Sequence, residues 1–253
     1  MKKFFKTIGI CIGLPFLNLL VANIAQVIFF KCTGNNLQLL KNNAYIIAFL
    51  ADIITLILMY IVFLPTNEGL CHRIKLKKIE AKDYFYISIL GIGVTILLLF
   101  LTGILTLLIP SYKETVKLMA TARQSILQLI ITIILIPIYE EIFYRGIIFG
   151  YLRKNFNIII AIILQAFIFG FMHMNLVQGI YAFIFGVVLA LVYIYTESII
   201  GNILLHMIFN LLGILIIPNL VMKMPALSIV LLILGVICTI YSIRKMVYKS
   251  KKA

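Results

Sequence analysis

The chain consists largely of long apolar runs separated by short polar or basic segments. Each run is close to the ~20 apolar residues that an α-helix needs to cross about 30 Å of hydrocarbon. None shows the two-residue alternation of a half-buried strand. The pattern therefore predicts an all-α, polytopic transmembrane helical bundle of about eight membrane-spanning helices. The expected spans are residues 7–30, 44–65, 85–110, 125–152, 157–174, 178–195, 199–217 and 225–243.

The composition supports this interpretation and excludes an ordinary soluble domain. The 253 residues are 64% hydrophobic and only 12% charged, with a mean hydropathy of +1.17, whereas soluble domains are about 25% charged. No linker or low-complexity segment interrupts the runs, which predicts a single integral membrane domain over residues 1–253. Within it we distinguish the N-terminal spans (1–120), a motif-bearing core (120–220), and the last span with a basic tail (225–253).

The net charge of +14 follows membrane topology and does not indicate nucleic-acid binding. Fifteen of the 22 Lys and Arg residues fall at the two ends of the chain or in the loops near residues 73–82 and 153–154. Six fall in the alternate loops, and Arg145 lies inside a span. Because cytoplasmic loops are enriched in Lys and Arg, we expect a multi-pass protein of the cell membrane with both termini in the cytoplasm.

The stretch IYEEIFYRG, residues 138–146, places three charges inside an apolar span. Ionisable groups within a span are costly and usually serve a function. Glu141 and Arg145 are four residues apart and can form an ion pair on one helical face, whereas Glu140 points about 100° away. Pro137 frees a backbone carbonyl one turn earlier and favours a kink. Two interpretations stay open: a structural ion pair beside a second structural acid, or a pair that supports a general base.

Two histidines lie in or at the ends of other spans. His173 follows Phe169 by four residues, and His206 precedes Asn210 by four, so each pair shares a helical face. Glu140 and His173 are each about 16 or 17 residues from the turn near residue 156, and antiparallel helices would place them at one depth. His206 reaches that level if the 150–158 hairpin protrudes from the membrane. A third intramembrane acid, Asp52, is expected to hydrogen-bond a neighbouring helix.

These side chains suit hydrolysis. Glu140 and His173 can hold and deprotonate a water, while His206 and Asn210 can donate hydrogen bonds to the oxyanion of a tetrahedral intermediate. Alternatively, Glu140, His173 and His206 could bind a divalent metal such as zinc. We favour no metal and no cofactor because the candidate ligands come from three helices with no local ligand pair. The four cysteines are scattered, with no spacing typical of a metal site.

Three ordered motifs resemble those of a known family. EExxxR at 140–145, FxxxH at 169–173 and HxxxN at 206–210 are similar to those of the CPBP proteins, the CAAX-processing and bacteriocin-processing (Abi) intramembrane endopeptidases. The resemblance covers about residues 120–220. It implies an intramembrane CAAX-type endopeptidase of glutamate type, or a metalloprotease, acting on a peptide or membrane-anchored protein. Its catalytic residues would be those proposed above, with Glu141, Arg145 and Phe169 supporting them.

The substrate and two other function classes stay open. The chain is rich in Ile, Lys and Asn and has no Trp, a bias expected of an AT-rich bacterial genome. The resemblance then implies bacteriocin immunity or peptide-signal processing rather than cleavage of prenylated proteins. A non-catalytic membrane immunity or scaffold protein would keep the same residues as a structural network. A proton-coupled transporter could use Glu140 and His173 as a relay, but internal repeats typical of transporters are missing.

Overall fold

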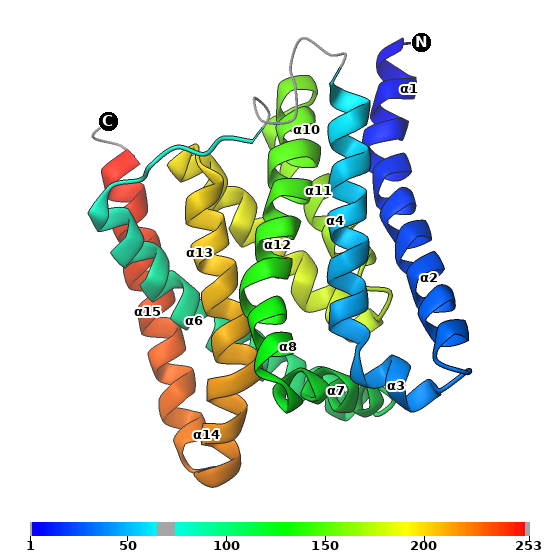
Figure 1. Ribbon diagram of the computed structural model, residues 1–253. Coiled ribbons are helices and arrows are strands. Elements are labelled where there is room, and N and C mark those ends of the chain that lie inside the picture. The colour runs from blue at the N-terminus through cyan, green and yellow to red at the C-terminus, as the bar shows by residue number, and fades with distance from the viewer. Residues whose placement is uncertain (1, 65–73, 251–253) are drawn as a thin grey trace. The chain divides into compact units, whose positions relative to one another are not determined.

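The computed structural model describes residues 2–64 and 74–250, and every regular element in these ranges is a helix (Figure 1). Cys71 lies outside the described residues. Within the described ranges, seven helical segments are long and apolar enough to cross a membrane. This confirms a polytopic, all-α membrane protein. The seven segments are Lys3–Cys32, Ala44–Phe63, Ala81–Leu108, Ile126–Asn155, Leu176–Thr196, Ile199–Lys223 and Leu227–Lys249.

The predicted span at 157–174 differs from the others. It forms helix α11, Ile158–Phe171, which has 14 residues, or about 21 Å at 1.5 Å per residue. Its apolar composition continues to Met172, but the backbone turns there, with Met174 at φ 52° and Asn175 capping the next helix. The hydrophobic run is therefore longer than the helix, and α11 is shorter than the ~30 Å of a bilayer core.

The chain divides into two compact units, each built from two separate stretches of sequence. The first unit comprises Met1–Lys75 and Lys117–Ala161, and the second comprises Leu76–Val116 and Ile162–Ala253. The α-helices of the first unit are α1 (Lys2–Ile8), α2 (Leu14–Cys32), α3 (Leu37–Asn42), α4 (Ala44–Phe63), α8 (Ile126–Ile130), α9 (Ile136–Glu140) and α10 (Gly150–Asn155). Short π-helical stretches join several of these helices into longer continuous helices. They are Gly9–Gly13, Ile131–Leu135 and Glu141–Phe149.

Hydrogen bonds tie the two stretches of the first unit together. The Thr7 and Tyr151 hydroxyls are 2.8 Å apart, and Lys3 Nζ donates to the Asn155 carbonyl at 2.9 Å. Helix α1 therefore begins beside the end of α10. Farther along, Gln128 Nε2 donates to the Asn42 carbonyl at 2.7 Å, and helices α2 and α4 pack side by side (Figure 1).

The second unit is organised around α6. Its α-helices are α6 (Ala81–Leu108), the start of α7 (Tyr112–Ala120), most of α11, α12 (Leu176–Thr196), α13 (Ile199–Asn210), α14 (Ile217–Lys223) and α15 (Leu227–Ser250). Helices α12, α13 and α15 all pack against α6. A Cβ added at Gly93 of α6 would lie 2.8 Å from the Gly235 carbonyl oxygen of α15. Small residues at this crossing let the two backbones approach, as in many membrane helix pairs.

A second close helix crossing, between α11 and α12, fixes the position of the turn that carries His173. A Cβ on Gly170 of α11 would lie 2.5 Å from the carbonyl oxygen of Gly179 in α12, and one on Gly186 would lie 3.1 Å from Ala166 Cα. Gln165 Nε2 adds a hydrogen bond of 2.8 Å to the Gly186 carbonyl. The end of α11 is therefore fixed against the first half of α12.

Candidate active site

The ion pair predicted from helical spacing is present in the first unit. Arg145 Nη1 donates to Glu141 Oε1 at 2.9 Å, and both side chains are completely buried. Removing one partner of such a pair would leave the other charge buried without compensation. Each of Glu141 and Arg145 therefore requires the other at this buried position, whereas their supporting role in catalysis stays a prediction.

The backbone around the ion pair is π-helical. The stretch Glu141–Phe149 follows directly on Glu140, the last residue of α9, and a second π-helical stretch, Ile131–Leu135, precedes Pro137. The predicted disturbance near Pro137 thus takes the form of a changed hydrogen-bond ladder in which Ile136 N donates to the Ile131 carbonyl. Such π-helical segments occur frequently at functional sites.

Glu140 differs from Glu141 in its exposure. Glu141 is fully buried, whereas Glu140 is partly exposed. Glu140 interacts electrostatically with Asp52 of α4 as well as with Glu141 and Arg145. The two adjacent acids therefore differ: Glu141 is fully buried in an ion pair, whereas part of the surface of Glu140 stays exposed.

Asp52 is held by the helix next to its own, as predicted. Asn18 Nδ2 of α2 donates to Asp52 Oδ1 at 3.1 Å and lies 3.3 Å from the Thr55 hydroxyl. Thr55 in turn donates to the Ala51 carbonyl at 2.9 Å. The sequence favours a structural hydrogen bond for Asp52 over a catalytic role. Its electrostatic interaction with Glu140 depends on how α4 packs on α9, which spacing along the chain cannot reveal.

In the second unit, Phe169 lies between the two histidines. Its ring centroid is 5.0 Å from that of His173 and 6.1 Å from that of His206, with interplanar angles of 87° in both cases. Phe169 is 1% exposed and His206 4%. Phe185 of α12 packs on His206 in the same way, at 5.2 Å and 84°. These edge-to-face contacts hold the imidazole planes in fixed orientations.

The hydrogen bond of His173 defines its neutral tautomer. His173 Nδ1 is 2.9 Å from the Phe169 carbonyl oxygen. A carbonyl can only accept, so Nδ1 carries the proton and Nε2 is the basic nitrogen of the neutral ring. His173 lies in the turn after α11 and is partly exposed. An oriented imidazole with its basic nitrogen directed away from the backbone is suited to accept a proton from water.

His206 and Asn210 lie one turn apart at the end of α13. Asn210 is the last residue of that helix, and the π-helical stretch Leu211–Ile216 follows it. Asn210, the last residue of the HxxxN motif, thus lies where an α-helix passes into a π-helix. Glu140, the first residue of EExxxR, lies at a junction of the same kind. Among the described residues, no group of three or more His, Cys, Asp or Glu side chains is placed to hold a metal ion.

The predicted site residues are shared between the two units. Glu140, Glu141 and Arg145 belong to the first unit, whereas Phe169, His173, His206 and Asn210 belong to the second. Within the second unit the structure brings Phe169, His173 and His206 into contact. The convergence of Glu140 with these residues stays a prediction, as does the choice between a metal-free and a metal-assisted mechanism.

A comparison with protein families identifies the segment that carries these residues. Residues 122–212 match the model of the type II CAAX prenyl endopeptidase Rce1-like family. The match covers a little over a third of the chain and confirms the resemblance inferred from the motifs. No curated protein and no solved structure matched the chain.

The Rce1-like segment, residues 122–212, contains all seven predicted site residues. It begins in the first unit and ends in the second, close to Asn210. The match indicates a peptidase of the intramembrane type, and the apolar helices that carry the segment agree with it. Helices α2, α4, α6 and α15 lie outside the matched residues and are described by the structure alone.

Proposed function

We propose that the protein is an intramembrane endopeptidase that hydrolyses a peptide bond in a peptide or membrane-anchored protein. The observation that carries the proposal is the Rce1-like match over residues 122–212, which includes every acid, imidazole and amide assigned to the reaction. The orientation of both imidazoles by Phe169 supports it.

In the proposed reaction, Glu140 and His173 hold a water molecule. The water oxygen attacks the carbonyl carbon of the scissile bond, and its proton moves to the Glu140 carboxylate. His206 and Asn210 donate hydrogen bonds to the oxyanion that forms. The carbon–nitrogen bond then breaks as Glu140 returns the proton to the leaving amine, which releases a new carboxyl terminus and a new amino terminus.

Metal-assisted hydrolysis is the competing form of the same proposal. Glu140, His173 and His206 would then be the ligands, and the bound ion would activate the water. The donor set is chemically suitable for zinc, but the Nδ1 hydrogen bond of His173 restricts this residue to coordination through Nε2. We favour the glutamate-type reaction because the ligands come from separate elements.

The test measures hydrolysis of a fluorogenic peptide library by the purified chain in detergent. Glu140→Gln, His173→Ala and His206→Ala should each lower kcat/KM by about 10²–10⁴-fold, the usual range for general-base or oxyanion groups. Glu114→Gln removes an exposed acid of α7 and is the matched control. Equal activity in wild type and all variants would refute the proposed endopeptidase activity. Loss of activity on adding a chelator, followed by recovery on adding zinc, would favour the metal-assisted reaction.

A second comparison in the same assay tests the substrate class. We propose a bacterial role in bacteriocin immunity or peptide-signal processing, for which the substrates are unprenylated hydrophobic peptides. The enzyme should therefore cleave an apolar peptide without a lipid at least as well as a prenylated peptide ending in CAAX. Strict dependence on the prenyl group would overturn this assignment while leaving the peptidase itself intact.

A further inference from the structure

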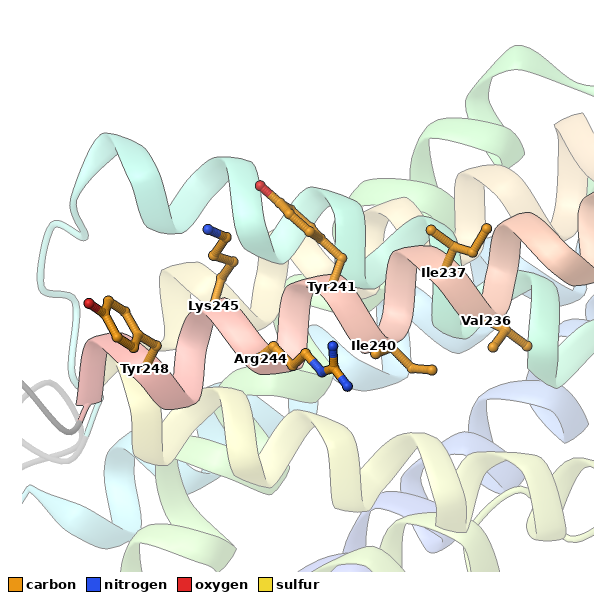
Figure 2. Close-up of a pocket in the computed structure, with 7 residues that line it drawn as sticks. All are labelled: Val236, Ile237, Ile240, Tyr241, Arg244, Lys245 and Tyr248. Carbon is orange, nitrogen blue, oxygen red and sulfur yellow. The ribbon is translucent and has the colours of Figure 1, made fainter.

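One face of α15 combines an apolar surface with two cations at its end. Seven residues of this helix line a pocket of about 690 Å³ (Figure 2). They form two adjacent stripes at four-residue spacing, and each stripe changes from aliphatic to cationic towards the C-terminus. The first stripe is Val236, Ile240 and Arg244, and the second is Ile237, Tyr241, Lys245 and, one turn farther on, Tyr248.

This surface extends over most of the depth of one bilayer leaflet. Val236, Ile237 and Ile240 are 41%, 58% and 48% exposed. From Val236 to Arg244 the helix rises about 12 Å, which is most of the ~15 Å of hydrocarbon in one leaflet. When these residues face lipid chains, Arg244 and Lys245 therefore lie at the level of the headgroups.

Within the described part of the chain, no carboxylate neutralises the two cations. Both are exposed, and neither Arg244 nor Lys245 forms an ion pair among the residues that the structure describes. Lys245 Nζ lies 5.7 Å from the centre of the Tyr241 ring. The Tyr241 ring packs in turn on Tyr86 of α6, at 6.4 Å. Lys245 is thus held beside Tyr241, whereas Arg244 extends from the other side of the helix in Figure 2.

Lys249, one turn later, differs from Arg244 and Lys245 because its charge is paired with carboxylates of α6 and the residue before it. Its Nζ lies 2.9 Å from both Asp83 carboxylate oxygens and 2.9 Å from Glu80 Oε2. Asp83, only 6% exposed, also accepts from the Tyr195 hydroxyl at 2.6 Å. These contacts fix the end of α15 to the start of α6, so Lys249 serves the fold and leaves Arg244 and Lys245 available for a ligand.

We propose that this surface of α15 binds an anionic phospholipid. The acyl chains lie along the two stripes, and the phosphate is bound by the Arg244 guanidinium and the Lys245 ammonium. Arginine suits phosphate because it donates two parallel hydrogen bonds, and basic clusters at the end of a span attract anionic headgroups. The proposal is independent of the peptidase activity.

The absence of Trp from the sequence permits a site-specific test. Ile237→Trp introduces a single indole fluorophore on the proposed site, and Ile229→Trp introduces one on the exposed start of the same helix. The purified full chain is reconstituted into vesicles of phosphatidylcholine mixed with phosphatidylglycerol, in which only one of the two lipids is brominated and quenches indole fluorescence on contact. Each basic residue near an anionic lipid surface is worth about fivefold in affinity. Quenching in the Ile237→Trp variant should therefore favour phosphatidylglycerol by at least that factor.

Three comparisons make the result decisive. Arg244→Gln with Lys245→Gln should abolish the preference in the Ile237→Trp variant, and Ile229→Trp should show none. Lys113→Gln with Lys223→Gln removes the same charge from exposed positions at the other end of the α6–α15 pair and should leave the preference intact.

If the first double variant does not fold, 1 M salt should abolish the preference in Ile237→Trp with both cations present, because the Debye length falls to about 3 Å. Equal quenching by both lipids, or a preference that survives loss of both cations, would overturn the proposal.

Discussion

The buried pair Glu141–Arg145 makes a quantitative prediction about stability. At 2.9 Å, two unit charges attract each other by about 6 kcal/mol if the effective dielectric constant is near 20. Desolvation of both groups offsets most of this attraction, so the net contribution of the intact pair is small. Loss of one partner, however, leaves an uncompensated charge at a fully buried position and costs about 3–5 kcal/mol.

A double-mutant cycle separates these effects. Glu141→Gln and Arg145→Met should each lower the Tm by about 6–20 °C in detergent, since 1 kcal/mol corresponds to about 2–4 °C for a chain of this size. The combined variant should regain much of that loss because no buried charge remains. Lys113→Met, at an exposed position of α7, is the control and should change the Tm little. Additive losses in the combined variant would show that the two groups do not interact, and that the reasoning is wrong.

Three further predictions concern the turn around His173. Gly170→Ala should destabilise the protein by about 1–3 kcal/mol, through a clash with α12; Gly103→Ala, which meets nothing within 4 Å, should not. Phe169→Leu should lower kcat by about 10–100-fold with little change in KM, because both imidazoles lose an aromatic contact. In a background without native cysteines, Met174→Cys should react with a charged thiol reagent at least ~10-fold faster than Phe167→Cys, because thiolates form only in water. Equal reactivity would place the turn in lipid.

Much of the fold and part of the site could be predicted from local spacing. Run lengths located the seven spans because helix length and bilayer thickness are simply related. The Glu141–Arg145 pair followed from four-residue spacing, which acts within a single helix. The amphipathic helix α7 was not predicted, and Asp83, which lies just before the expected span 85–110, is buried in the first turn of α6.

Contacts between helices could not be predicted in this way. Phe169 and His173 share a helical face, but the approach of His206 to the same ring depends on how α11 and α13 are placed within the second unit. The contact between Lys249 and Asp83 joins residues 166 positions apart. Small residues such as Gly170 and Gly179 determine such crossings, and a single sequence does not reveal which glycines face each other.

The short length of α11 has a consequence for the chemistry. The helix follows the basic residues Arg153 and Lys154, which belong at a membrane interface, and it extends for only about 21 Å. We therefore expect the turn that carries His173 to lie within the depth of the hydrocarbon. Non-helical backbone is tolerated at such depth only where it is buried in protein or lines a water-filled cavity. His173 and Met174 are not buried, so we expect water to reach this turn, and water is the co-substrate that the proposed endopeptidase requires.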